Sequence, residues 1–262
     1  MNRIPKIIHY CWFGGRPLPP QAVRCIASWK KHCPDYEIIE WSESNFDVNL
    51  VLDAYPYVKE ALAEKKWAFV TDVLRLYLVY TYGGIYMDTD VELLKPLDKL
   101  LTHEMFIGFE SKDFLNTGSG FGGEKNHPVL NKMLDYYRDL SFYHADGSLN
   151  TTPTPVYITK ILSREGLRLN NKTQTVNGIA AYSTEYLCPL SFKTRKLKIT
   201  KNTYSIHHFF GAWLTDEQQQ MEADIQQYAK RYGRFLAKMI CHYKRDGIRG
   251  FWEKIKRMLR SP

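Results

Sequence analysis

Residues 64–98 read EKKWAFVTDVLRLYLVYTYGGIYMDTDVELLKPLD and decide the fold. An apolar run precedes two glycines and a short strand, and then come Asp88 and Asp90, separated by one residue. Because strand side chains alternate between faces, both carboxylates would point the same way if the strand continued through them. Two hard oxygen ligands at a strand end suit Mg²⁺ or Mn²⁺. The alternative is a turn that carries two solvated acids.

The helix expected at residues 67–82 is apolar nearly all round, which predicts that it is buried. Gly83 and Gly84 are placed to end it with a left-handed cap. Asp72 and Arg75 stand three residues apart on one face of this helix. Buried charges are tolerated only when they are paired or ligated. These two residues therefore either pin the helix as an internal ion pair or face a ligand beside the Asp-x-Asp segment.

The rest of the chain alternates strands with helices. Strands are expected at residues 6–13, 36–41, 105–110 and 175–181, a strand-like segment at 116–123, and helices at 20–32, 50–66, 127–138, 151–166 and 215–244. This order predicts an α/β fold with a parallel sheet and helices on its faces. We expect one domain at residues 1–214 and a helical extension at 215–262. At the first strand end, Trp12 either stacks on a nucleotide base or covers the sheet edge.

Residues 204–213, YSIHHFFGAW, form a second unusual segment. His207 and His208 leave a β-like stretch, and the aromatic residues up to Trp213 suit a loop that folds over a site. A neutral imidazole is a further ligand for a divalent ion. The alternative is one packed and one exposed histidine.

Composition narrows the class of protein. With 44% hydrophobic and 24% charged residues, the chain of 262 residues is typical of a globular protein. No window approaches the roughly 18 apolar residues of a spanning helix, and no early stretch resembles a secretion signal, so we expect a cytoplasmic protein. The five cysteines are odd in number and form no CxxC pair, which argues against a disulfide framework and a zinc site.

The basic charge is concentrated at the carboxyl terminus. Of the net charge of +8, residues 230–262 carry +9 and leave about −1 for the rest. This asymmetry favours an anionic membrane surface over nucleic acid as a partner. The last residues predict a basic amphipathic helix with apolar side chains near helical spacing, namely Phe251, Trp252, Ile255, Met258 and Leu259. Packing on the protein body or on another subunit is the alternative.

Three segments together resemble the bacterial family 32 glycosyltransferases, the group with a DXD sugar-binding region. They are IPKIIHYCWFGG at residues 4–15, TDVLRLYLVYTYGGIYMDTD at 71–90 and HHFFGAW at 207–213. The resemblance implies a GT-A fold, which is a Rossmann-like nucleotide-binding sheet with flanking helices. It also implies a nucleotide-sugar donor, a Mn²⁺ or Mg²⁺ ion, and transfer that retains the anomeric configuration.

The resemblance also assigns roles in donor binding. Trp12 would lie near the nucleotide base, and Trp213 would belong to a lid over the donor. Asp72 and Arg75 would hold the sugar or a phosphate of the donor.

A second group of roles concerns the metal. Asp90 would be the principal ligand, and Asp88 would lie near the ribose or the metal. One of His207 and His208 would complete the metal shell or touch the diphosphate. Together these residues predict a metal-dependent hexosyltransferase.

The expected reaction moves a hexose, from a UDP-sugar by preference, to a saccharide acceptor. A lipid-linked intermediate of capsule or another surface polysaccharide would fit a membrane-bound tail, with the enzyme peripheral on the inner face of the cell membrane. One alternative is a phosphatase of the haloacid dehalogenase type, but that class needs Asp-x-Asp on the first strand and a later Gly-Asp-x-x-x-Asp. Another is a non-catalytic, membrane-associated protein that binds nucleotide sugars.

Overall fold

A computed structural model describes residues 2–211 and 216–260 of the chain. Contacts divide the chain into two compact units. The first contains Met1–Pro189 and Lys198–His208, and the second contains Leu190–Leu197 and Phe209–Pro262. The second unit thus begins a few residues before the boundary that we predicted, and it takes in a short earlier segment as well.

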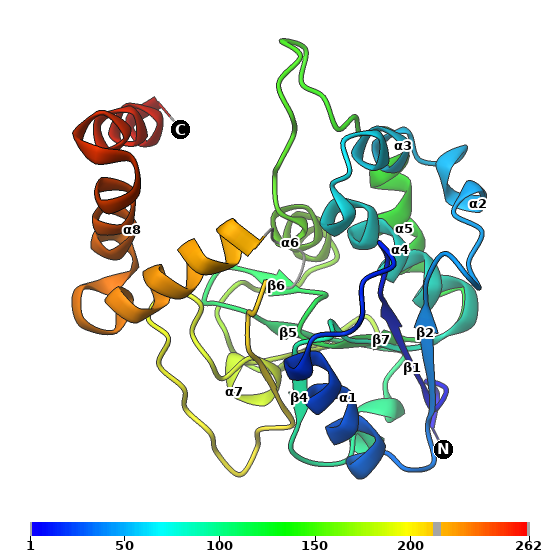
Figure 1. Ribbon diagram of the computed structural model, residues 1–262. Coiled ribbons are helices and arrows are strands. Elements are labelled where there is room, and N and C mark those ends of the chain that lie inside the picture. Colours follow the sequence, from blue (N-terminus) through cyan, green and yellow to red (C-terminus); the bar gives the residue numbers. More distant parts are fainter. Residues whose placement is uncertain (1, 212–215, 261–262) are drawn as a thin grey trace. The chain divides into compact units, whose positions relative to one another are not determined.

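A mixed sheet forms the centre of the first unit, in the order β2-β1-β3-β7-β5-β9-β8 with β6 beside β5 (Figure 1). Its strands are β1 (Ile7–Cys11), β2 (Glu37–Trp41), β3 (Gly84–Tyr86), β5 (Met105–Phe109), β6 (Leu115–Asn116), β7 (Phe121–Gly123), β8 (Gln174–Val176) and β9 (Ile179–Tyr182). β1 runs parallel to β2 and β3, and β5 runs parallel to β9. β7 is antiparallel to both β3 and β5.

This arrangement confirms the α/β class, but the prediction of a parallel sheet is wrong. The connection from β5 through β6 to β7 is too short for the crossover that a parallel return requires. Because β7 opposes both of its neighbours, β3 and β5 point the same way. The carboxyl ends of β1, β3 and β5 therefore lie at one edge of the sheet.

The single strand predicted at residues 175–181 is also wrong. The segment forms the antiparallel pair β8 and β9, and Asn177 and Gly178 connect the two strands. Both connecting residues have positive φ, 49° and 77°, as a tight hairpin turn requires. Asn-Gly was the sequence signal for this turn.

Helices cover both faces of the sheet, as a GT-A architecture requires (Figure 1). One face packs against α2 (Asn49–Leu52), α3 (Pro56–Ala63), α4 (Trp67–Tyr82), α5 (Pro128–Arg138) and α6 (Thr154–Arg164), and the other against α1 (Pro20–His32), the 3₁₀ helix η1 (Asp98–Thr102) and α7 (Thr184–Leu187). Met105 and Ile107 belong to the first hydrophobic core, whereas Phe106 belongs to the second. This alternation along β5 explains why the strand is apolar throughout.

Helix α4 has the predicted bounds; seven of its 16 residues are buried, all between Val70 and Val79, and of the others only Tyr82 is exposed. The predicted left-handed cap is wrong, because Gly83 combines φ 71° with ψ −176°. That conformation, open mainly to glycine, turns the chain directly from α4 into β3. Gly84 is fixed by crowding, since a Cβ there would lie 2.8 Å from the Ile7 carbonyl oxygen.

In the second unit, α8 (Asp216–Arg260) is broken by non-helical backbone at Gly233 and Gly247. The long helix predicted at residues 215–244 is therefore interrupted at Gly233, and the second break, at Gly247, falls after its predicted end; the two glycines take positive φ, 74° and 66°. The side chains of Ile255, Met258 and Leu259, on which the tail prediction partly rests, lie outside the described residues. No helix in the described ranges has the length and apolar character that crossing a bilayer would need.

Candidate active site

The Asp-x-Asp segment lies in a turn between β3 and β4 (Val91–Leu93), not on a strand. Val91 N–H donates to the Asp88 carbonyl oxygen at 3.0 Å and closes this turn. The strand alternation that we expected to align Asp88 and Asp90 is therefore wrong. The turn brings the two carboxylates together instead.

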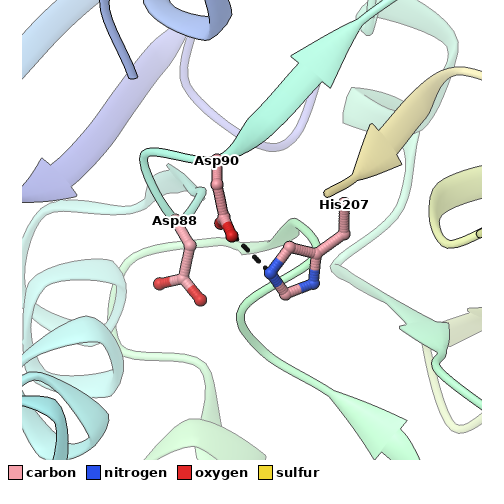
Figure 2. A group of neighbouring side chains, drawn as sticks. All are labelled: Asp88, Asp90 and His207. Carbon is pink, nitrogen blue, oxygen red and sulfur yellow. Dashed lines mark ion pairs between the residues drawn. The ribbon is translucent and has the colours of Figure 1, made fainter. Parts of the chain in front are cut away.

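The turn and one histidine form a three-residue cluster. β10 (Ser205–His207) pairs with β4 in antiparallel register, which sets His207 opposite Val91. Ligand atoms of Asp88, Asp90 and His207 all lie within 4.8 Å of one another. Figure 2 shows these side chains converging, with His207 Nε2 3.1 Å from Asp90 Oδ1. Two carboxylates and an imidazole are a suitable donor set for a divalent cation such as Mn²⁺.

Burial shapes the charge of this cluster. Desolvation raises the pKa of Asp88, although Arg75 acts in the opposite direction. Desolvation alone would lower the pKa of His207, but the Asp90 carboxylate outweighs it and raises the pKa well above its usual value. The side chains of His207 and Asp90 are only 8% and 12% exposed, which makes their attraction strong.

Arg75 connects α4 to the cluster. Its Nη2 lies 3.2 Å from an oxygen of Asp72 and 3.2 Å from Asp88 Oδ1, and its Nη1 donates to Asp88 Oδ2 at 3.4 Å. The guanidinium also lies 5.0 Å from the centre of the Tyr86 ring. Arg75 thus contacts both carboxylate oxygens of Asp88. Asp72 forms a second ion pair with the same guanidinium group. Of the two alternatives predicted for Asp72 and Arg75, the structure shows the internal ion pair. Arg75 of this pair also contacts Asp88 of the candidate metal site.

His208 belongs to a different contact. Its ring Nε2 lies 2.8 Å from Glu92 Oε2. Its backbone N–H donates a hydrogen bond to the Asp90 carbonyl oxygen at 3.0 Å. Because neighbouring residues of an extended chain point to opposite sides, only His207 faces the two aspartates. Of the two histidines considered, the described cluster includes His207 alone.

The two tryptophans assigned to the donor have different outcomes. Trp12 follows β1 at the same sheet edge and donates from Nε1 to the Arg16 carbonyl oxygen at 2.5 Å. It is partly buried against the second hydrophobic core. Its contact with a base stays a prediction. Trp213 lies outside the described residues.

Sequence reasoning missed three site residues on the far side of Asp88. Glu110 follows β5 directly and accepts a hydrogen bond from Asn116 Nδ2. Asn116 Oδ1 in turn accepts one from Gly118 N–H at 2.6 Å. A Cβ on Gly118 would lie 2.2 Å from Asp88 Oδ2, so this glycine packs directly on the carboxylate. The available signal was a glutamate at the end of an otherwise apolar strand.

Comparison with known proteins agrees with this site. Residues 19–107 match the family described as the glycosyltransferase sugar-binding region containing DXD motif. A curated relative, inositol phosphoceramide mannosyltransferase 3 of Schizosaccharomyces pombe, is 31% identical over 152 residues, which are 54% of this chain and 39% of the relative. These comparisons support a glycosyltransferase.

Two further comparisons concern glycosyltransferases. Human alpha-1,4-N-acetylglucosaminyltransferase is 28% identical over 133 residues, which cover 50% of this chain and 36% of the human protein. Among solved structures, the PaToxG glycosyltransferase has a TM-score of 0.47 and 23% identity, covering 62% of this chain and 69% of that one. The chain spans well under half the length of the two curated relatives. These two are fungal and human, so the bacterial surface-polysaccharide type stays a prediction.

The shifted pKa of Asp72, which lies within the matched residues 19–107, predicts how the stability of the protein changes with pH. Desolvation raises its pKa to about 6, against a hydrogen bond from Thr154 and the attraction of Arg75. Between about pH 4 and 6 the folded state thus binds more protons than the unfolded state, and stability falls as the pH rises. Relative to Asp72→Asn, wild-type protein should lose about 2 kcal/mol of unfolding free energy between pH 4 and pH 7.

Denaturant unfolding of both proteins across this pH range measures the difference. Asp135→Asn is the matched control, because Asp135 also pairs with an arginine three residues on but is half exposed. A wild-type minus Asp72→Asn difference that stays constant with pH would contradict the assignment.

Proposed function

We propose that this chain is a retaining, metal-dependent glycosyltransferase that moves a hexose from a nucleotide sugar to a saccharide acceptor. The observation that carries the proposal is the cluster of Asp88, Asp90 and His207, with Arg75 fixed against one of its carboxylates. The family match over residues 19–107 supports glycosyl transfer as the chemistry.

The chemistry of the donor set fits a divalent ion. Asp90 and His207 would hold it, with Asp88 as a further ligand that Arg75 keeps in place. A Mn²⁺ or Mg²⁺ ion bound there would neutralise charge that develops on the departing diphosphate. Asp88 and Arg75 would orient the donor about this point, so that the reacting bond is fixed before the reaction begins.

Retention of configuration defines the bonds that change. The bond between the anomeric carbon and the diphosphate oxygen breaks, and a bond from the acceptor oxygen to the same carbon forms on the same face. The acceptor proton passes to the departing phosphate. The chain then needs no protein nucleophile, and positioning together with stabilisation of the leaving group supplies the catalysis.

The donor is testable by binding. We favour a UDP-sugar, and a screen should include UDP-glucose, UDP-galactose, UDP-N-acetylglucosamine and GDP-mannose, because the relatives are named for mannose and N-acetylglucosamine. A ligand that binds only the folded state raises the melting temperature. We expect one of these donors to raise it in the presence of Mn²⁺ and not with EDTA. No shift with any of them would contradict the proposal.

Two alternatives make different predictions. A phosphatase of the Asp-x-Asp type would turn over a chromogenic phosphate ester and leave nucleotide sugars intact. Here the motif follows β3 rather than the first strand, which does not suit that class. A non-catalytic binding protein would bind the donor without cleaving it, so nucleotide-sugar hydrolysis separates it from an enzyme.

For the acceptor, we propose a lipid-linked saccharide at an anionic membrane surface, which would make the enzyme a peripheral protein of the inner membrane face. The second unit supports this with large apolar side chains that are exposed among basic residues, including Phe235, Leu236, Tyr243, Ile248 and Trp252. Aromatic and basic residues together suit a membrane interface. One relative is also named for a lipid, inositol phosphoceramide.

Deletion of residues 248–262 should weaken association with anionic liposomes, because it removes Trp252 and a cluster of basic residues. Donor hydrolysis in solution should stay within about twofold of wild type, since the deletion lies outside the unit that holds the carboxylates. Sedimentation with liposomes measures the association. Trp252→Ala in the full chain should reproduce part of the loss, while Phe114→Ala, an exposed aromatic of the first unit, should not. Equal sedimentation before and after deletion would refute the membrane proposal.

A further inference from the structure

Glu110 is a partly buried charged residue at the end of an apolar strand. It directly follows the fully buried strand β5, and its backbone N–H donates to the Phe114 carbonyl oxygen at 2.9 Å. Desolvation raises the pKa of its carboxyl group, against His207 and a hydrogen bond from Asn116. A carboxylate that is largely removed from water is costly unless its oxygens are hydrogen-bonded, so the place of this partly buried residue needs a reason.

A chain of hydrogen bonds connects Glu110 to the candidate metal site. Glu110 accepts from Asn116, Asn116 accepts from Gly118 N–H, and the Gly118 carbonyl oxygen accepts from Asp88 N–H at 3.1 Å. The charges of Asp88 and His207 both act on the Glu110 carboxyl group. Glu110, Asn116 and Gly118 therefore form a wall of the candidate site next to the Asp-x-Asp turn. In the strand order this wall lies beyond β3, on the side opposite to β1.

This wall has hydrogen-bonding capacity that the protein leaves unused. Among the described residues, Asn116 occupies only Oε2 of Glu110, and no partner reaches Oε1. The hydroxyl groups of Thr117 and Ser119, in the same segment, are fully buried and have no hydrogen-bond partner. Glu110 Oε1 can therefore accept a hydrogen bond from a ligand, whereas the two buried hydroxyl groups have no accessible surface at which a ligand could reach them.

The strand order indicates which part of a donor would lie here. β1, β3 and β5 point the same way, and β3 stands between the other two. Trp12 follows β1, Asp88 follows β3 and Glu110 follows β5. With the base near Trp12 and the diphosphate near Asp88, the next group along the donor falls toward Glu110. β5 lies two strand spacings from β3, or about 10 Å, with β7 between them.

We propose that Glu110 accepts a hydrogen bond from a hydroxyl group of the transferred sugar and thereby helps to select the donor. A carboxylate repels phosphate, so a neutral ligand that donates hydrogen bonds is the class that suits it. A further metal ligand suits it less well, because the cluster of mutually close ligand atoms does not include it. The inference rests on the proposed function.

The test compares the affinities of the protein for a nucleotide sugar and for the nucleoside diphosphate that this sugar donor contains. Calorimetry in the presence of Mn²⁺ measures both affinities. The donor is the one that gives the largest shift in the screen above. For Glu110→Ala, we expect the affinity for the nucleotide sugar to fall about 10- to 100-fold, as for a hydrogen bond to a charged group. The affinity for the diphosphate should change less than about twofold. Glu110→Gln, which keeps one acceptor oxygen, should lose only about 3- to 10-fold.

Asp113→Asn is the matched control, because Asp113 is an exposed carboxylate in the same connection and should change neither affinity. Thermal unfolding of each variant checks the fold. Equal losses for the diphosphate and the nucleotide sugar would mean that Glu110 only supports Asn116, and unchanged affinities would mean that it has no role; either result overturns the inference alone. If wild-type protein binds neither ligand, the proposed function fails as well.

Discussion

Asp90→Ala is expected to lower the rate of metal-dependent donor hydrolysis at least about 1,000-fold while leaving the fold intact. Asp90 lies beside both Asp88 and His207, so its loss removes the residue that joins the other two. The variant should also lose the Mn²⁺-dependent rise in melting temperature. Steady-state hydrolysis and thermal unfolding, each with Mn²⁺ and with EDTA, measure the two effects.

Glu92→Ala is the matched control for Asp90→Ala. Glu92 is an acid two residues further along and contacts His208, outside the described cluster. We expect its effect on hydrolysis to stay within about tenfold, the range of a supporting residue. If Asp90→Ala hydrolysed the donor at the wild-type rate, the metal assignment would be wrong and a binding protein or another site would have to be considered.

Gly118→Ala is expected to reduce donor hydrolysis about 100-fold with little loss of stability. The new Cβ would lie 2.2 Å from Asp88 Oδ2 and 3.0 Å from Arg75 Nη1. The backbone of Gly118 needs no positive φ, so alanine fits its conformation and only the contact is at fault. The Asp88 carboxylate must move, and the geometry of the cluster changes with it.

Gly123→Ala in β7 separates this effect from general crowding. Its Cβ would lie 3.0 Å from a Leu130 methyl group in the core, a tight contact with an apolar side chain rather than with a carboxylate. Gly123→Ala should lower the melting temperature and leave the Mn²⁺ affinity unchanged. Gly118→Ala should lower the Mn²⁺ affinity and leave the melting temperature nearly unchanged. Mn²⁺ affinity from calorimetry and melting temperature from thermal scans decide between them. An unchanged Mn²⁺ affinity in Gly118→Ala would show that the position of Asp88 does not matter.

Local signals predicted the elements whose ends are set by the chain itself. Helix α1 has the predicted bounds, since Pro20 fixes a helical φ at its start and Pro34 prevents continuation. Helix α4 also has the predicted bounds, because an apolar surface all round leaves burial as the only stable arrangement. The conformation of Gly83 was not predicted, since it depends on the direction that β3 takes.

The sequence by itself indicated that Asp72 and Arg75 pair on a buried helix and that Asp88 and Asp90 suit a metal ion, and it left open whether the two pairs meet. The tertiary structure alone decided how they meet. Their convergence depends on a turn after β3, and the choice of His207 over His208 depends on the register of β10 against β4. Glu110 joins the site only because β7 reverses direction between β3 and β5. Strand order and register arise from contacts between distant residues, which no local pattern contains.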